Sequence, residues 1–190
     1  MNYVTFDIET YSPSSLNKID TNEFRVSVIG AYCSWLDRYL VFLEKDVSVF
    51  LNILRECDLV VGYNHLWFDL PVLQKYATFD LKQLPSYDIM LEMEASIGYK
   101  PKLNDLCKAN FEDDLKTDDY ATYSKYHKEN KWLELVDYCL NDVRLTENLF
   151  QNIIDGKPIH FFDLHIKKEA ILPKPTAQKV TFAETTESIF

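Results

Sequence analysis

Apolar residues alternate with polar ones along the first part of the chain, as they do in half-buried β-strands. Val4, Phe6 and Ile8 recur with period two and predict a buried strand over residues 3–8. Similar patterns predict strands over residues 25–35 and 39–43, joined by a turn at residues 37–38. These three strands predict an antiparallel meander, and the polar segment 11–24, which contains Pro13, is predicted to be a loop.

The spacing then changes to that of helices. Val47, Phe50, Leu51 and Leu54 recur every three or four residues and predict a helix to residue 55, with Asp46 as its cap. The apolar run 59–62 predicts a short inner strand parallel to the first. A loop over 64–69, a short strand at 86–88 and further helices are then predicted over 70–76, 89–97, 102–109 and 132–153.

This order of elements predicts an α/β domain with a mixed central sheet flanked by helices. The domain is predicted to span residues 1–165, followed by a C-terminal tail over 166–190. Pro173 and Pro175 and a polar end lead us to expect loose packing or partial disorder from residue 159 onward. The structure of the charged, tyrosine-rich segment 110–131 stays open.

Charge and composition narrow the function. A net charge of −10 argues against holding nucleic acid by general electrostatics, but it is compatible with a local acidic site that binds divalent cations. The four cysteines are scattered without Cys-x-x-Cys spacing, which argues against zinc. No apolar run reaches the roughly 20 residues of a membrane span, and the N-terminus lacks signal-peptide features, so we expect a cytoplasmic protein without a membrane partner.

Asp7 and Glu9 are two residues apart on the first strand and therefore point to the same face. Two adjacent carboxylates repel each other unless a cation lies between them. A strand end that reaches solvent is the usual explanation of an isolated Asp-x-Glu. Asp69, at the start of a helix, is likewise most often a cap when taken alone.

The long helix over 132–153 places Tyr138 and Asp142 four residues apart, on the same sector as Leu145 and Leu149. A carboxylate on an apolar sector is costly unless it is paired or binds a metal. Asp142 is therefore either a rim residue that meets an arginine or water, or a ligand that faces an acidic metal site.

Three segments together resemble a known family: Phe-Asp-Ile-Glu-Thr at 6–10, Gly-Tyr-Asn-His-Leu-Trp-Phe-Asp-Leu-Pro at 62–71, and Tyr-Cys-Leu-Asn-Asp-Val at 138–143. They resemble the three motifs of the DEDD superfamily of 3′–5′ exonucleases, which implies an RNase H-like fold. Tyr138 precedes Asp142 by four residues, as in the tyrosine (DEDDy) branch. Within that branch the chain looks closest to the YprB-like ribonuclease H-like predicted exonucleases. Similar modules occur as proofreading domains or subunits of DNA polymerases.

The resemblance implies that Asp7, Glu9, Asp69 and Asp142 hold two divalent metal ions, Mg²⁺ or Mn²⁺, for which oxygen ligands are suitable. Such a pair of ions stabilises the attacking and leaving oxygens of a phosphodiester displacement. Tyr138 would orient the attacking water rather than act as a strong base, because a free phenol titrates near ~10. The expected product is a nucleoside 5′-monophosphate.

The implied substrate is the 3′ end of a single-stranded nucleic acid, with DNA favoured, and replication or repair is the implied context. Thr10, Asn64 and Phe68 are the candidate substrate-binding residues, and the implied partner is a DNA polymerase or another replication protein. Phe68 and Trp67 could stack on bases, but an aromatic beside a strand end is more often a core residue. For Asp88, which precedes a predicted helix, capping is the favoured role.

Two other function classes remain. The fold is shared by endonucleases of the RNase H and resolvase type, and an inactive nuclease-like domain could serve as a binding subunit of a polymerase or helicase. The presence of all four acids and the tyrosine favours the active exonuclease. The choice between DNA and RNA, the oligomeric state and the pathway are open at the level of the sequence.

Overall fold

The computed structural model describes residues 1–11, 21–111, 126, 129–176 and 180, and it contains a five-stranded mixed sheet. The strand order is β3 (Arg38–Leu43), β2 (Arg25–Cys33), β1 (Tyr3–Tyr11), β4 (Leu59–Gly62), β5 (Ser86–Asp88). Strands β1, β2 and β3 are antiparallel neighbours, whereas β4 runs parallel to β1 and to β5. The predicted α/β fold, with a mixed sheet in which a meander is followed by parallel strands, is confirmed. Most of the loop predicted over 11–24, and most of 110–131, lie outside the described residues.

The helices also follow the sequence pattern closely. They are α1 (Val47–Glu56), α2 (Asp69–Leu73), α3 (Ile89–Ile97), α4 (Leu103–Asn110) and α6 (Trp132–Asp155), with 3₁₀ turns at Glu44–Asp46, Gln74–Tyr76 and Leu81–Gln83. Gly156 ends α6 in a left-handed conformation with φ 73°. One detail of the prediction is wrong: the side chain of Asp46 makes no capping hydrogen bond to α1, because a 3₁₀ turn leads directly into that helix.

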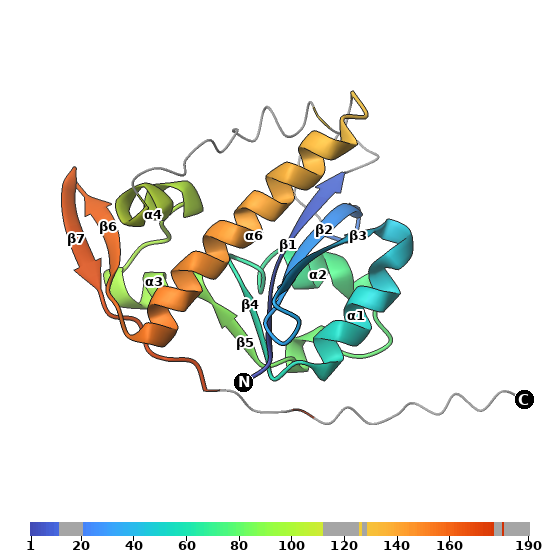
Figure 1. Ribbon diagram of the computed structural model, residues 1–190, viewed down its shortest axis with the longest axis horizontal. Coiled ribbons are helices and arrows are strands. Elements are labelled where there is room, and N and C mark those ends of the chain that lie inside the picture. The colour runs from blue at the N-terminus through green and yellow to red at the C-terminus, as the bar shows by residue number, and fades with distance from the viewer. Residues whose placement is uncertain (12–20, 112–125, 127–128, 177–179, 181–190) are drawn as a thin grey trace, which may run out of the picture.

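Helices cover both faces of the sheet, and the alternation along β1 decides which residues each face receives (Figure 1). Val4, Phe6 and Ile8 lie in the core that contains Phe50 and Leu54 of α1. Tyr3 lies instead in a second core, together with residues of α6 and α3. Thr5, Asp7 and Glu9 lie on the same face of β1 as Tyr3, so their side chains point toward α6.

A carboxyl group of α6 anchors the helix to the start of β1. Glu147 is buried and accepts hydrogen bonds from the Tyr3 hydroxyl at 2.6 Å and the Thr5 hydroxyl at 2.5 Å. Gln151 donates to Glu147 at 2.7 Å and also to the Tyr3 hydroxyl. These bonds fix the position of α6 along the strand, and no feature of the sequence pattern had singled out Glu147.

Gly30 allows α6 to approach the middle of the sheet. It lies opposite Asp7 in the β1–β2 pairing. A Cβ at this position would lie 3.0 Å from the sulfur of Cys139 and 3.1 Å from Cγ2 of Val143, which is closer than ordinary van der Waals contact. The absence of a side chain at residue 30 therefore brings this part of α6 directly over β1 and β2.

The chain after α6 is better ordered than the sequence suggested. Residues expected to pack loosely form a hairpin of β6 (Ile159–Asp163) and β7 (Ile166–Ala170), and this hairpin lies beside α4 (Figure 1). Ile159, Phe161 and Leu172 are buried in the second core. A boundary at residue 165 would separate two paired strands, so the tail prediction is wrong for residues 166–172. The error arose because the hairpin has no classical turn residues: Leu164 and His165 both adopt positive φ, at 48° and 68°.

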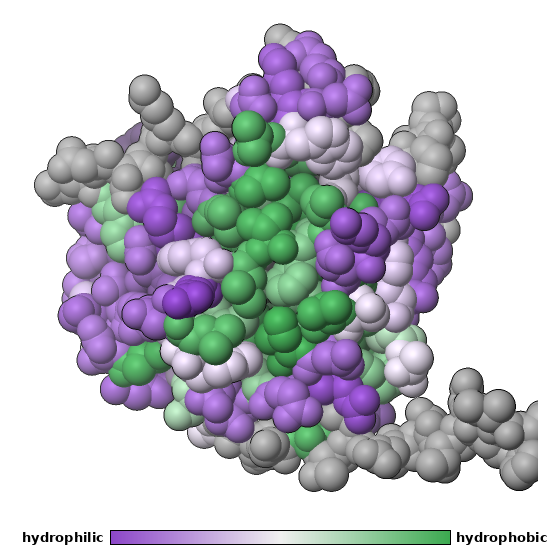
Figure 2. All heavy atoms as spheres, turned by 45° about the vertical axis from the view of Figure 1, so that its right-hand side comes forward, coloured by the Kyte–Doolittle hydropathy of each residue, from purple (hydrophilic) through white to green (hydrophobic). Residues whose placement is uncertain are grey.

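The edge strand β3 leaves apolar side chains on the surface. Tyr39, Val41 and Leu43 point away from the first core and are 40–43% exposed. Figure 2 shows apolar residues gathered on the face that is turned forward from the side of β3 in Figure 1. Among the described residues, none of the helices combines the length and the apolar character that crossing a membrane requires.

Candidate metal centre

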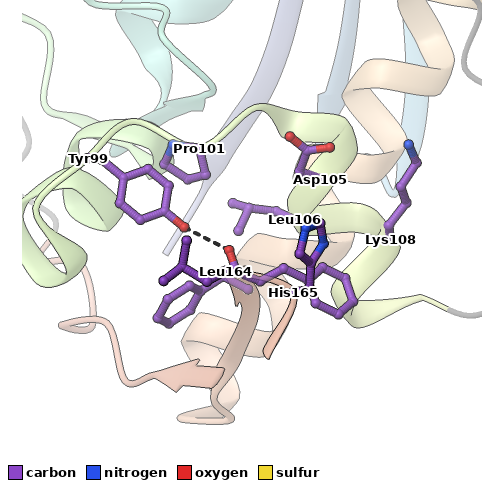
Figure 3. Close-up of a pocket in the computed structure, with 9 residues that line it drawn as sticks. Tyr99, Pro101, Asp105, Leu106, Lys108, Leu164 and His165 are labelled. Atoms are coloured by element: carbon purple, nitrogen blue, oxygen red, sulfur yellow. Dashed lines mark hydrogen bonds between the residues drawn. The ribbon is translucent and has the colours of Figure 1, made fainter. Parts of the chain in front are cut away.

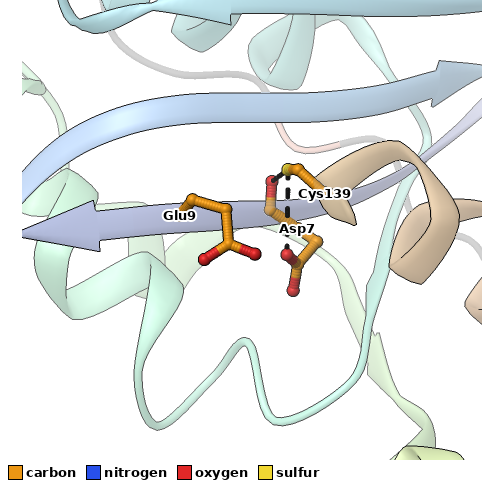
Figure 4. Close-up of side chains that lie close together, drawn as sticks. All are labelled: Asp7, Glu9 and Cys139. Carbon is orange, nitrogen blue, oxygen red and sulfur yellow. Dashed lines mark hydrogen bonds between the residues drawn. The ribbon is translucent and has the colours of Figure 1, made fainter. Parts of the chain in front are cut away.

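Two carboxylates lie side by side near the end of β1. Asp7 is half-buried and Glu9 is only 6% exposed, and both point to the face of the strand that α6 covers (Figure 4). A ligand atom from each, together with the sulfur of Cys139, lies within 4.8 Å of the others. The pairing of β1 with β2 slips directly after Glu9, between Glu9 and Thr10. Such a bulge changes the direction of the strand at its end, and it occurs here at the acidic pair.

Cys139 connects this pair to α6. Its thiol accepts a hydrogen bond from the Gly30 N–H at 3.1 Å and donates to the backbone oxygen of Asp7 at 3.5 Å, with the Asp7 carboxylate at 3.8 Å. Burial, followed by the charges of Asp7 and Glu9, raises the pKa of the Cys139 thiol well above its usual value. Without a cation, the thiol therefore stays protonated and acts as a donor to Asp7. No motif or spacing in the sequence had indicated this contact.

Four carboxylates lie close enough together for their charges to interact. Burial raises the pKa of Asp7 well above its ordinary value, and the negative charges of Asp69, Glu9 and Asp142 raise it further. These are the four residues that the sequence motifs had singled out. Like charges gathered in a poorly solvated place disfavour ionisation of one another, and a bound cation relieves that cost.

Asp69 begins α2 but points toward β1. Its Oδ1 accepts a hydrogen bond from the Ile8 N–H at 3.1 Å. That N–H is available because β1 pairs with β4 only as far as Thr5. Burial raises the pKa of Asp69 to about 7 although the Ile8 N–H favours the charged form. The structure assigns the N-cap position of α2 to Phe68, so the simple capping role weighed for Asp69 does not apply.

The long helix supplies Asp142 and Tyr138. Both are half-buried, and burial raises the pKa of Asp142 to about 7. Leu145 and Leu149, predicted to share their sector, are fully buried. Tyr138 packs against the small cluster of Val28, Leu135 and Cys139. Asp142 thus lies on the inner side of α6, near enough to the β1 acids for its charge to affect Asp7.

The tightest group of ligand atoms is smaller than the predicted set. Among the described residues, only Asp7, Glu9 and Cys139 form a group of three such atoms within 4.8 Å of one another. Asp69 and Asp142 lie outside this group, and their charges raise the pKa of Asp7 within it. Carboxylate oxygens dominate the set, so the residues fit a hard divalent cation, which the extra two acids would help to bind.

The three candidate substrate-binding residues lie in different settings. Thr10 is half-buried at the bulge that follows Glu9. Asn64 has a positive φ of 66°, and its carbonyl accepts hydrogen bonds from the N–H groups of residues 67 and 68. Phe68 packs against the first core, with its ring 5.5 Å from that of Phe24. Trp67 is the more exposed aromatic of this loop, at 66%.

Asp88 fixes the loop that carries Asp69. Its buried carboxylate accepts from the N–H groups of Met90 at 3.1 Å and Leu91 at 3.4 Å, which confirms the predicted capping of α3. It also accepts from the N–H groups of Asn64 at 2.9 Å and Leu66 at 3.1 Å. Burial opposes ionisation of Asp88, but the neighbouring His65 and the N–H groups of Asn64 and Leu66 together lower its pKa. The capping residue is therefore also a tie between β5 and the loop before α2, which the sequence did not reveal.

His65 occupies the inside of the same loop. It is fully buried, with Nδ1 3.4 Å from Asp88 Oδ2, and neither ring nitrogen has a hydrogen-bond partner among the described residues. A Cβ at Gly62 would lie within 2.9 Å of this ring, so glycine is required there. His65 is thus a tightly packed residue of the loop.

Comparison with known proteins extends the fold assignment. No protein-family model matches the chain, and no curated protein matches it in sequence. Among solved structures, the family B DNA polymerase from the hyperthermophilic archaeon Pyrobaculum calidifontis is similar, with a TM-score of 0.58 and 18% sequence identity. The match covers 80% of this chain but only 24% of the polymerase chain. At this level of identity the likeness concerns the fold, and it shows that a region of a DNA polymerase has the same arrangement.

Proposed function

We propose that this protein is a two-metal-ion 3′–5′ exonuclease. Its substrate is the 3′ end of a single-stranded nucleic acid, with DNA favoured, and its product is a nucleoside 5′-monophosphate. The observation that carries the proposal is the gathering of acids at β1: Asp7 and Glu9 offer ligand atoms within 4.8 Å of each other, and Asp69 accepts a hydrogen bond from the Ile8 N–H between them. The charges of Glu9, Asp69 and Asp142 all raise the pKa of Asp7, in agreement with this arrangement. Three distant segments of the chain thus bring their acids to one place, and they are the segments that resemble the exonuclease motifs.

The chemistry of the side chains supports a role for divalent cations. Asp7, Glu9, Asp69 and Asp142 would hold two ions, Mg²⁺ or Mn²⁺, for which carboxylate oxygens are suitable ligands. Bound there, the ions would supply Lewis-acid stabilisation of the attacking and leaving oxygens. The protonated thiol of Cys139 would keep Asp7 oriented through its hydrogen bonds. The hydroxyl of Tyr138, one helical turn before Asp142, would orient the attacking water.

The similarity to a DNA polymerase supports a role in replication or repair. The chain corresponds in length to a part of that polymerase. A separate chain with this fold could act as a proofreading-type subunit, beside a polymerase or another replication protein. The motif resemblance to the tyrosine branch and the YprB-like group supports the same interpretation.

Labelled oligonucleotides test the proposed activity. With Mg²⁺ or Mn²⁺, the wild type should release labelled mononucleotide from a 3′-labelled strand and give a ladder of shortened products from a 5′-labelled strand. Asp7→Ala and Asp142→Ala should lower the rate on the order of 10³-fold, because several kcal/mol of metal-dependent stabilisation is lost and each ~1.4 kcal/mol is a factor of ten. Glu56→Ala is the matched control, since Glu56 is an exposed acid of α1 and should leave the rate unchanged.

Other products would indicate the competing functions. Cleavage of a circular single strand would establish an endonuclease of the RNase H or resolvase type. Binding without any metal-dependent degradation would establish an inactive nuclease-like subunit. Matched DNA and RNA strands in the same assay decide the sugar preference, which depends on contacts to the 2′-hydroxyl.

A further inference from the structure

Exposed aromatic and cationic side chains form a strip that starts in the loop carrying Asp69. Trp67 is 66% exposed and lies two residues before Asp69. The ammonium group of Lys100 lies 5.6 Å from the centre of the Trp67 ring, a distance typical of a cation–π contact. Lys100 also lies 3.6 Å from Glu94, in an exposed ion pair of the kind that contributes little stability. The ammonium group therefore remains available to a phosphate.

The strip continues into a cavity between α4 and the β6–β7 hairpin. Tyr99, next to Lys100, donates a hydrogen bond from its hydroxyl to the carbonyl of Phe162 at 3.1 Å. Both residues line a cavity of about 410 Å³ (Figure 3). Its polar lining includes Lys108, His165 and one acid, Asp105. Aromatic rings and the side chain of Lys108 thus line a cavity of the size that binds small ligands.

The β6–β7 turn, which lines one side of this cavity, has an unusual backbone conformation. Leu164 and His165 adopt consecutive positive φ values, although neither is glycine. Such positions are disfavoured for residues with side chains, and they are maintained only where the surrounding structure imposes them. The turn places His165 in the lining of the cavity. In a chain with net charge −10, this grouping of rings and cations differs from the acidic average of the molecule.

We propose that this strip binds the nucleotides upstream of the 3′ terminus of a single-stranded nucleic acid. We define the strip as six residues: Trp67, Tyr99, Lys100, Lys108, Phe162 and His165. Single strands are bound by rings on which bases stack and by cations that follow the phosphates, and the strip supplies both. Its start in the loop of Asp69 connects it to the carboxylates that would receive the 3′ end. This inference deepens the proposed function and rests on it for the direction of the strand.

Direct binding measurements test the strip without any need for catalysis. The probe is a fluorescein-labelled oligothymidylate of twenty nucleotides, followed by fluorescence anisotropy in Ca²⁺, with an oligouridylate as the RNA arm. Trp67→Ala should raise the Kd about tenfold or more, because a stacking partner is lost. Lys100→Glu and Lys108→Glu should raise the Kd and reduce the salt dependence of binding. Trp67→Phe should restore much of the affinity, since it keeps a ring.

Matched residues at the opposite edge of the sheet serve as controls. Trp35→Ala removes an exposed tryptophan from the β2–β3 turn, and Lys45→Glu reverses an exposed lysine after β3. Both variants should bind as the wild type does. Equal Kd values for the wild type, Trp67→Ala, Lys100→Glu and Lys108→Glu would overturn the proposal. Thermal melting of each variant shows whether a loss of binding reflects a loss of folding.

A length-dependent assay separates failure of this inference from failure of the proposed activity. On the nitrophenyl ester of thymidine 5′-monophosphate, which has no upstream nucleotides, the strip variants should match the wild type. On the long oligonucleotide they should raise KM and leave kcat nearly unchanged. If the wild type hydrolyses neither substrate, the proposed activity fails, and the anisotropy data still decide whether the strip binds. Unchanged KM on the long strand, with an active wild type, contradicts the strip alone.

Discussion

Two buried acidic places lie between β1 and α6, and they are built in opposite ways. At the start of β1, Glu147 is surrounded by donors: the hydroxyls of Tyr3 and Thr5 and the amide of Gln151. Near the end of the strand, Asp7 and Glu9 face each other and the charges of two more acids. Between the same strand face and the same helix, one carboxyl group is fully hydrogen-bonded, whereas several others repel one another.

The difference separates a structural role from a functional one. A carboxyl group with several donors contributes to the fold, because its burial is compensated by hydrogen bonds. Carboxylates that raise the pKa of one another cost stability unless a cation binds. The donors at Glu147 fix α6 along β1, and that position brings Cys139 and Asp142 to the acidic group. The hydrogen bonds of Glu147 therefore help to position the residues of the acidic group.

Glu147→Ala should remove the hydrogen bonds between α6 and the start of β1 and have the largest effect on stability. The change leaves two buried hydroxyls without their acceptor, and we expect a loss of roughly 2–5 kcal/mol in the free energy of unfolding. Urea unfolding measures this loss. Glu147→Gln keeps one acceptor oxygen and should cost less. A Glu147→Ala protein as stable as the wild type would show that these hydrogen bonds contribute no net stability.

The pH dependence of stability should sharpen the contrast. Asp69 and Asp142 have folded-state pKa values of about 7, and that of Asp7 is also raised, whereas an unfolded aspartate titrates near ~3.9. Their protonated forms therefore stabilise the metal-free fold below pH ~4, and this stabilisation is lost as the pH rises through about 7. Melting of the metal-free protein should occur at a lower temperature at pH 8 than at pH 5.

Metal ions and one substitution provide the controls for this effect. Mn²⁺ should raise the melting temperature more at pH 8 than at pH 5, because deprotonated ligands bind it better. Asp7→Asn should flatten the pH dependence and weaken the response to Mn²⁺, since one of the competing charges is removed. Melting temperatures that rise from pH 5 to pH 8 in the metal-free wild type would contradict the assignment of an acidic group under mutual repulsion.

Gly30→Ala should have the smallest effect, and it should act at the contact between β2 and α6 that lies between Glu147 and the acidic group. The new Cβ would lie 3.0 Å from Cys139 and 3.1 Å from Val143, so α6 must move by a few tenths of an ångström. We expect a loss of about 1–3 kcal/mol in stability, as is usual for overpacking, and a weaker affinity for Mn²⁺. Val143→Ala in the same chain should restore part of both, and a purely additive double mutant would contradict the contact.

Local pattern was a good guide to the elements and a partial guide to the site. The alternation over Val4, Phe6 and Ile8 and the helical spacing over Val47 to Leu54 predicted strand and helix correctly, because burial of one face imposes a period. The same logic placed Asp142 on the inner side of α6. It failed for the β6–β7 hairpin, whose turn residues, Leu164 and His165, carry none of the usual turn signals.

The sequence by itself determined which residues can be ligands, because residue type and spacing along one strand or helix are local properties. Asp7 and Glu9 share a face for that reason, as do Tyr138 and Asp142. Only the tertiary structure decided what each acid meets. Glu147 finds hydroxyls 142 and 144 residues away, Asp88 finds the backbone of the Asp69 loop, and Asp7 finds three other acids. These partners come from distant parts of the chain, so their effect on charge and stability follows from packing and not from any local pattern.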